Sequence, residues 1–396
     1  MFAEEIVLNV MNAVLSYLFL EFQGLGMEIG ILCRTVYPIH GFGGAEKHVY
    51  YVAKGLAERG HEVHIYCLEA DDASDEEYED LDHENLVLHE VEYRDLGMGR
   101  LNFFEYVYLM RKNWDELDEL DIVHSHGIFP ITAYSYFHEN DIVVTTHGLE
   151  EFRYRHLKIP LAPFNFFDKR AARKRVDRFI ALSKGNREDQ KRLLGIGDDV
   201  ITEIPNGVDA DFFQPSDTSE VEKRYDLRDN VVVAVSRLVE YKGHGLLVEA
   251  VNQMDDTSLV IAGDGPFKEE LEEKAGEDVH FAGRVPEDEL PLYYSLGDVF
   301  CLPTFGEGLP LSILESLSCG TPVLSTNVGS IPDVVTEDIG EVVEPEEVEE
   351  LRKGLENLFD RDLEEMSGRC RKKALEEYSW DSVVEKTERV YEDLSS

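Results

Sequence analysis

Two carboxylates and a proline lie in one short segment, F-G-E-G-L-P-L-S-I-L-E, at residues 305–315. An apolar strand precedes it, Pro310 suits the first turn of a helix, and Gly320 suits the end of that helix. The amino end of the helix would present free N–H groups and favour bound negative charge. Glu307 falls in the loop, whereas Glu315 falls on the helix, where a carboxylate can accept two hydroxyl groups such as a ribose offers. The alternative is that Glu315 is solvated on the polar face of the helix.

A pair of cations lies five residues apart in S-R-L-V-E-Y-K-G, residues 236–243, in a chain that is short of cations. Arg237 ends a predicted strand and Lys242 begins the next helix, so both could converge on a diphosphate. Arg suits bidentate contact with phosphate oxygens, and Lys acts as a point charge. Surface cations that offset an acidic surface are the alternative, but the position at the carboxyl end of a strand favours binding.

A glycine-rich loop, H-G-F-G-G-A-E at residues 40–46, directly follows the first predicted strand. Gly43 and Gly44 would let the backbone approach a ligand closely, and the helix that follows would direct its amino end to the same place. The loop lacks the G-x-G-x-x-G spacing of a dinucleotide fingerprint. Taken alone, it is equally well explained as a tight turn.

The elements that must position these residues alternate regularly between strand and helix. Strands are predicted at 28–33, 62–67, 86–91, 121–126, 141–147 and 178–183, and again at 231–236, 258–263, 279–283, 299–303, 322–326 and 340–343. A helix at 45–59 carries apolar residues at the helical period and stops at Gly60. Apolar strands that alternate with amphipathic helices indicate parallel sheets covered on both faces.

The turn-forming segment I-P-N-G-V-D, residues 204–209, divides the two series of strands. We therefore predict an α/β fold with two Rossmann-like, doubly wound domains, 27–205 and 206–376, that face each other across a ligand-binding cleft. A last helix within 377–396 needs a partner face and is expected to pack back on the first domain. Residues 1–26 are expected to be an extension of the fold or an interfacial helix at a membrane, since their apolar stretch is short for a span.

The composition is strongly acidic, with 82 acidic residues against 38 basic ones and a net charge of −44. The acidic residues are scattered along the chain, which favours a salt-adapted protein over a merely acidic cytosolic one, because screening is strong at high salt. The charge argues against nucleic-acid binding, which needs an excess of Lys and Arg. The five cysteines form no C-x-x-C spacing, so disulfides and zinc sites are not expected and a reducing interior is indicated.

Taken together, these motifs resemble the retaining glycosyltransferases of family 4, which have the GT-B fold. The resemblance covers nearly the whole chain from Met27, and the order and spacing of the motifs make it specific. It rests on G-G at 43–44, R-x4-K-G at 237–243, G-D-G-P at 263–266, E-x7-E from Glu307 to Glu315, G-T-P-V-L-S-T at 320–326 and G-S-I-P-D at 329–333.

The resemblance implies a site for a nucleotide diphosphate sugar in the second domain and an acceptor site in the first. Arg237 and Lys242 would hold the diphosphate and stabilise the leaving group, and Glu315 would bind the ribose. The other donor contacts that it implies are Gly43 and Gly44 at the diphosphate, Gly308 and Leu309 at the sugar and phosphate, and Arg284 and Val285 at the base.

Two side chains would lie near the reacting carbon if the resemblance holds. Glu307 would contact the transferred sugar, and His126, in V-H-S-H-G, would lie beside it. A core histidine at the end of a strand is the alternative for His126, and His124 and His147 are weaker candidates. Retention in this family is ascribed to front-face attack, in which the departing phosphate helps to take the acceptor's proton, so no glycosidase-like pair of carboxyl groups is required. No cofactor and no metal ion are predicted, and metal dependence stays open.

The most basic and aromatic stretch of the chain, residues 152–178, falls in the domain expected to bind the acceptor. It suits a lipid-phosphate acceptor or peripheral contact with the inner face of a membrane by a cytoplasmic protein, and a solvated basic helix face is the alternative. The acceptor would be a sugar, a glycan or a lipid phosphate. Two other functions stay open: a nucleotide-sugar epimerase of the same architecture, for which no acid and base can be assigned, and a non-catalytic nucleotide-sugar-binding protein. The intact Glu307, Arg237 and Lys242 argue against the second.

Overall fold

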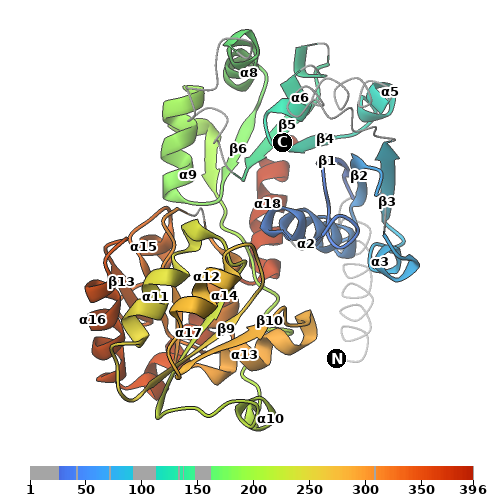
Figure 1. The fold of residues 1–396 in the computed structure, drawn as a ribbon. Helices are drawn as coiled ribbons and strands as arrows, with labels where there is room; N and C mark the ends of the chain where they lie inside the picture. Colours follow the sequence, from blue (N-terminus) through green and yellow to red (C-terminus); the bar gives the residue numbers. More distant parts are fainter. Residues whose placement is uncertain are drawn as a thin grey trace, which may run out of the picture.

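The computed structural model describes residues 26–41, 43–70, 73–91, 113–132, 134–136, 138–147, 162–306 and 309–395. Within them, the chain forms two α/β domains, each built on a parallel sheet that is covered by helices (Figure 1). The first sheet has seven strands in the order β3-β2-β1-β4-β5-β6-β7, and the second has six in the order β10-β9-β8-β11-β12-β13. The predicted fold class, two Rossmann-like domains, is confirmed.

The predicted strands agree with the observed ones to within two residues. The first sheet contains β1 (Glu28–Leu32), β2 (Glu62–Leu68), β3 (Leu86–Val91), β4 (Ile122–His126), β5 (Asp141–Thr146), β6 (Arg178–Ala181) and β7 (Ile201–Glu203). The second contains β8 (Asn230–Val235), β9 (Thr257–Ala262), β10 (Val279–Gly283), β11 (Val299–Leu302), β12 (Val323–Thr326) and β13 (Gly340–Val343). The sequence pattern missed only β7 among these, because three residues are too few for a periodic signal.

Helices connect most of these strands. In the first domain they are α2 (Gly44–Glu58), α3 (Asp75–Glu79), α5 (Trp114–Leu117), α6 (Phe129–Thr132), α8 (Ala162–Lys174) and α9 (Lys184–Asp189). In the second they are α10 (Ser219–Glu222), α11 (His244–Val251), α12 (Lys268–Lys274), α13 (Leu290–Leu296), α14 (Leu311–Ser318), α15 (Ile331–Val334), α16 (Val348–Phe359) and α17 (Leu363–Glu377), followed by α18 (Trp380–Ser395). Shorter helical turns lie at Tyr134–Tyr136, Gln190–Leu194, Asp198–Val200, Glu240–Lys242 and Glu287–Glu289.

Each sheet separates two apolar layers, which explains why the central strands are apolar along their whole length. In β1, Ile29 and Ile31 join one buried cluster while Leu32 joins the other. In β8, Val231 and Val233 face one layer, and the residue between them faces the opposite layer. In both sheets the strand order reverses beside the first strand, next to β4 and next to β11, and such reversal points leave a crevice at the carboxyl ends of the strands.

The last helix, α18, returns to the first domain and lies alongside α2 (Figure 1). Its apolar face enters the core of that domain through Val383, Val384 and Tyr391. The two domains are thus joined by two chain crossings. These crossings lie side by side, because the amide of Val208 donates to the carbonyl of Tyr378 at 2.7 Å.

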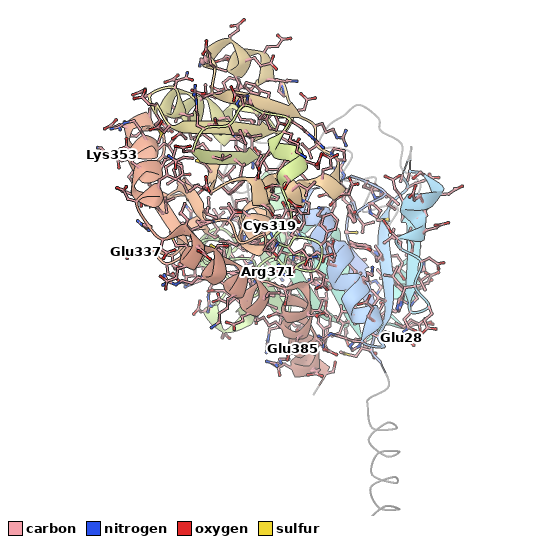
Figure 2. All side chains as sticks on the ribbon, turned by 90° about the horizontal axis from the view of Figure 1, so that it is seen from below. Glu28, Cys319, Glu337, Lys353, Arg371 and Glu385 are labelled. Atoms are coloured by element: carbon pink, nitrogen blue, oxygen red, sulfur yellow. The ribbon has the colours of Figure 1, made fainter. Side chains whose placement is uncertain are left out.

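Helix α14, which begins at Leu311, is fixed at its far end by one arginine. The guanidinium of Arg371, on α17, donates to the backbone carbonyls of Ala210, Phe213 and Ser318 at 2.7–2.8 Å. Figure 2 shows Arg371 beside Cys319, the cap residue of α14. A cation at this position also interacts favourably with the negative end of the helix dipole. The amino end of α14 is therefore held in a constant direction.

Candidate functional site

A cleft of about 1250 Å³ lies between the domains and is lined by residues of both. It brings together eight of the predicted site residues: Gly43, Gly44, Arg237, Lys242, Arg284, Val285, Leu309 and Glu315. Glu307 and Gly308, also predicted, lie outside the described residues. His126 is not among the described residues that line the cleft.

The two cations of the second domain lie on one rim of the cleft because of the turn that follows β8. Gly243 has a φ of 74°, and a Cβ there would lie 2.0 Å from the carbonyl oxygen of Pro303, so glycine is needed where the turn packs on the end of β11. The ring of Tyr241 lies near both cations. Its hydroxyl is 3.4 Å from Arg237 Nη2, and Lys242 Nζ is 5.6 Å from its ring centroid. The spacing R-x4-K-G therefore places two positive charges at one strand end.

Glu315 is buried, with 9% of its surface exposed, so the alternative of a solvated side chain is wrong. The hydroxyl of Tyr294, on α13, donates to its Oε2 at 2.6 Å. Burial raises the pKa of Glu315, while the nearby charge of Lys47 and the hydrogen bond from Tyr294 lower it in part. A buried carboxylate that still lines the cleft has unused acceptor capacity, and two vicinal hydroxyl groups would satisfy it.

Two helices direct their amino ends into the cleft, one from each domain. Helix α2 begins after Gly43 and α14 begins after Pro310, and neither cap residue makes a side-chain hydrogen bond to the first N–H groups of its helix. Pro310 occupies the cap position, one residue before its predicted place in the first turn. Uncapped N–H groups and the positive end of each helix dipole suit a phosphate group.

An ion pair that the sequence did not reveal joins the two domains across the cleft. Lys47, on α2, lies 2.5 Å from Glu287, which follows the predicted base contacts Arg284 and Val285. The hydroxyl of Tyr37 also reaches Glu287, at 3.5 Å. Only 10% of the Lys47 side chain is exposed. The sequence feature that could have identified Lys47 was its position, one turn into the helix that follows the glycine-rich loop.

Four histidines cluster on the first domain, beside the cleft. His126 ends β4, and its Nδ1 lies 2.9 Å from Nε2 of His147, while its own Nε2 is buried without a partner among the described residues. The ring of His48, on α2, lies edge-on to both of these rings at centroid distances of 5.4 and 5.1 Å. Burial lowers the pKa of all four, to about 4 for His48 and about 3 for His124. These rings are therefore neutral near pH 7.

The structure distinguishes the two histidines of β4. His124 is buried between two hydroxyl groups, with Nδ1 2.6 Å from the Tyr391 hydroxyl and Nε2 2.8 Å from the Thr145 hydroxyl. Both of its nitrogens are thus used inside the first domain, and it acts as a core residue. His126 has a buried, unused Nε2 and stays the candidate for contact with a substrate.

No group of three or more His, Cys, Asp or Glu side chains is placed to hold a metal ion in the described part of the chain. The sequence does contain Asp-x-Asp triplets at 80–82, 209–211 and 360–362, of which the second follows the crossing between the domains. There, Oδ1 of Asp209 accepts the amides of Asp211 and Phe212, and Oδ2 lies 3.4 Å from the Tyr51 hydroxyl. Asp209 thus has a structural use in the segment between the domains. In the same described part, no helix is both long and apolar enough to cross a membrane.

Two family profiles match the two halves of the chain. The profile described as Glycosyltransferase Family 4 matches residues 42–212, and the one described as Glycosyl transferases group 1 matches residues 216–377. Among similar proteins, the phosphatidylinositol N-acetylglucosaminyltransferase GPI3 subunit of Saccharomyces cerevisiae is 26% identical over 94% of this chain and 84% of its own length. A protein of Arabidopsis thaliana that is also named for phosphatidylinositol N-acetylglucosaminyltransferase is 28% identical over 92% of this chain and 82% of its own length.

A third relative matches part of the chain more strongly. The GDP-mannose-dependent α-(1-6)-phosphatidylinositol monomannoside mannosyltransferase of Mycobacterium tuberculosis is 36% identical over 46% of this chain and 53% of its own length. Among solved structures, the Anabaena protein HepE in complex with UDP superposes with a TM-score of 0.76 at 18% identity, over 93% of this chain and 100% of that one. Sucrose-phosphate synthase from Thermosynechococcus elongatus gives the same TM-score over 93% and 99%.

Proposed function

This chain belongs to the glycosyltransferases of the GT-B fold that use nucleotide-sugar donors, and we propose that it transfers the sugar to a lipid-linked or glycan acceptor with retention of anomeric configuration. The observation that carries the proposal is the convergence of Arg237, Lys242 and two uncapped helix ends on one cleft that also contains a buried carboxylate. This set fits a diphosphate and a ribose. In the proposal, Glu315 binds the ribose hydroxyls, and the backbone at Arg284 and Val285 contacts the base.

The charge arrangement supports cleavage of a bond between a sugar and a diphosphate. As that bond breaks, negative charge accumulates on the diphosphate and positive charge on the sugar ring. Arg237, Lys242 and the helix ends are already oriented toward the first charge, and preorganised groups of this kind give the largest stabilisation of a transition state. Glu307, which directly precedes Gly308 and Leu309, contacts the sugar in this proposal, and His126 lies beside the sugar.

An acceptor pocket is proposed in the first domain. A second cavity of about 580 Å³ lies at the carboxyl ends of β1 and β2 and shares Glu46 with the donor cleft. Arg34, His40 and Glu69 also line it, and such a mixture of charged and polar groups suits a hydroxylated head group. Three of the relatives are named for phosphatidylinositol substrates, which favours an inositol lipid as the first acceptor to test.

Contact with an anionic membrane is proposed for the basic segment at 152–178. Its first part lies outside the described residues, but Arg170, Arg173 and Lys174 in the last turns of α8 are exposed, as is Arg175 directly after it. Arg173 also donates to the carbonyl of Leu194, so one of these cations stabilises the domain. Binding to vesicles of anionic lipid, and not to vesicles of neutral lipid, would support the contact.

The experiment that tests the proposed function is a product assay with the full chain. UDP-glucose, UDP-N-acetylglucosamine and GDP-mannose would each be incubated with phosphatidylinositol vesicles in about 1 M KCl, where surface charges are screened. We expect one donor to raise the melting temperature, to release its nucleoside diphosphate and to give a product with the donor's anomeric configuration by NMR. An inverted product would contradict retention. Interconversion of nucleotide sugars without release of diphosphate would replace transfer by epimerisation.

Salt adaptation is proposed from the net charge of −44. Carboxylates repel one another across about 10 Å at 0.1 M salt but only across about 3 Å at 1 M. The melting temperature should therefore rise between these two KCl concentrations. An unchanged or falling melting temperature would instead indicate an acidic protein without salt adaptation.

A further inference from the structure

Asn206 lies at the first chain crossing and bonds to both domains at once. Its Oδ1 is 2.9 Å from Nδ1 of His48, on α2 of the first domain. Its Nδ2 donates to the carbonyl oxygen of Leu309 in the second domain, at 3.3 Å. The side chain is buried, with 6% of its surface exposed. One amide group therefore spans the gap between the two domains.

The hydrogen-bonding pattern fixes the orientation of each group. The carbonyl of Leu309 can only accept, so it must face the NH₂ group of Asn206, and Oδ1 must face His48. The ring of His48 then carries its proton on Nδ1 and donates it to Oδ1. With the opposite amide orientation, two oxygen atoms would face each other inside a buried contact, which is costly. Both hydrogen bonds therefore run in one direction: His48 donates to Asn206, and Asn206 donates to Leu309.

One end of the bridge lies at the donor cleft, and the other lies on a helix whose amino end opens onto it. Leu309 lines the cleft and directly follows Glu307 and Gly308 in the sequence. His48 lies one helical turn after Gly44, whose helix end lines the same cleft. The bridge thus connects the backbone beside the proposed sugar contact to the helix that approaches the diphosphate from the other domain.

The surroundings of Asn206 leave it little freedom. The next residue, Gly207, packs so closely on the ring of Trp380 that a Cβ would lie 2.5 Å from it. Trp380 stacks on Tyr51 at 4.8 Å and meets His48 edge-on at 5.7 Å. The chain crossing is thus tightly packed, so the hydrogen bonds of Asn206 can hold His48 and Leu309 in defined relative positions.

We propose that Asn206 is a positioning residue for sugar transfer: it holds the backbone of Leu309 against helix α2, so that the two halves of the donor site face each other in the reactive arrangement. This inference rests on the proposed function of the cleft. It predicts that loss of the bridge lowers turnover more than donor affinity, because the donor's diphosphate and ribose contacts in the second domain are unaffected.

The test compares two variants at one position. Asn206→Asp keeps an oxygen for His48 but removes the donor to Leu309, and Asn206→Ala removes both contacts. We expect kcat for hydrolysis of the accepted nucleotide sugar to fall by about 10- to 100-fold in both variants, as misplacement by about 1 Å can cause, with donor KM changed by less than about threefold. His48→Ala combined with Asn206→Ala should lower kcat no further than Asn206→Ala alone, since one bridge is removed once.

Asn140 provides a matched control. Its Nδ2 also donates to backbone carbonyls, those of Leu117 and Leu120, but all of these groups lie in the first domain. Asn140→Ala should lower the melting temperature and leave kcat per folded molecule unchanged. If both Asn206 variants keep the wild-type kcat, or lose activity only in step with a lowered folded fraction, the inference is overturned.

Hydrogen exchange tests whether the bridge is formed, without any substrate. Asn206→Asp should speed amide exchange at Leu309 and in the first turn of α14 relative to wild type, and should leave helix α11 unchanged. Equal exchange in wild type and variant would overturn the inference. A wild-type chain that hydrolyses none of the three donors would overturn the proposed function instead, and the exchange result would still decide whether the bridge holds Leu309.

Discussion

The two walls of the cleft differ in charge. The second domain forms the charged wall, which contributes the cations Arg237, Lys242 and Arg284 as well as the carboxylate of Glu315. The first domain forms the neutral wall: it lines the cleft with one carboxylate and one cation, Glu46 and Lys47, and holds behind them histidines that burial keeps neutral, such as His48 and His126. A leaving diphosphate needs fixed positive charge, whereas a sugar that becomes positive would be destabilised by a protonated histidine beside it. The fold therefore divides two tasks between its two domains: one faces the leaving diphosphate, and the other faces the sugar.

The largest expected effect comes from removing a cation from the charged wall. In Lys242→Ala, kcat for release of nucleoside diphosphate should fall by about 100- to 1000-fold, the range found when one preorganised donor to a developing anion is lost. The measurement is steady-state release in about 1 M KCl, where general charge effects are screened. Lys274→Ala, a change on the exposed end of α12, is the control and should keep wild-type kcat. Equal kcat in wild type and Lys242→Ala would remove the basis of the comparison.

A smaller effect is expected at the one buried carboxylate of the charged wall that the structure describes. Glu315→Gln should raise donor KM by about 10-fold, because hydrogen bonds to a charged group contribute about 1.5–3 kcal/mol. Burial raises the pKa of Glu315, so its carboxylate is lost as pH falls through that raised value, and wild-type KM should rise toward acid pH. Glu315→Gln should lack this rise. Tyr294→Phe removes a hydrogen bond that lowers the pKa, and should therefore shift the rise to higher pH.

The neutral wall predicts a dependence of stability on pH. Because burial lowers the pKa of the clustered histidines, the unfolded chain binds more protons than the folded one between about pH 6.5 and the folded pKa, which is about 4 for His48. Stability from this source is present above pH 6.5 and is lost as pH falls toward the folded values, by up to about 1.4 kcal/mol per pH unit for each histidine.

Urea unfolding at pH 7, 6 and 5 measures this dependence. His126→Asn removes one titrating ring and should reduce the slope of unfolding free energy against pH by about 1.4 kcal/mol per unit. The difference between variant and wild type isolates the histidine from the many carboxylates. An identical slope in both proteins would mean that His126 is not held neutral by its surroundings.

The smallest effect is expected at the ion pair that joins the two walls. Lys47→Gln breaks the ion pair with Glu287, and partly exposed pairs of this kind contribute about 0.2–1 kcal/mol. Binding of UDP or GDP by calorimetry should weaken by less than about 10-fold. In Glu287→Gln, Lys47 loses its carboxylate partner. This variant should bind the diphosphate as tightly as wild type or more tightly. Weaker binding in both variants would assign the pair to donor contact instead of domain contact.

Sequence reasoning located the charged wall better than the neutral one, and the reason is physical. Arg237, Lys242 and Glu315 belong to short segments in which a strand end, a glycine and a helix start are adjacent in the chain. Local spacing then fixes their positions. The predicted fold class followed from the same local signals, since apolar strands and amphipathic helices alternate throughout.

The neutral wall and the domain contacts depend on residues that are far apart in the sequence. Lys47 and Glu287 are separated by 240 residues, and His48 and Asn206 by 158. No periodic pattern encodes such pairs, because only the packing of the two sheets brings them together. The buried state of Glu315 was open for the same reason: its partner, Tyr294, lies on another helix.

The return of α18 to the first domain has a consequence for how the protein is made. The core of that domain includes Trp380, Val383 and Tyr391, and Tyr391 also satisfies buried His124. A ribosome that has finished the segment up to residue 205 must add about 190 more residues, which takes roughly 10–40 s at 5–20 residues per second. During that interval the side of α2 that packs on α18 is uncovered, while its other side can already pack on the sheet. This surface of the first domain is therefore completed only when α18 has been synthesised, although the domain itself is synthesised first.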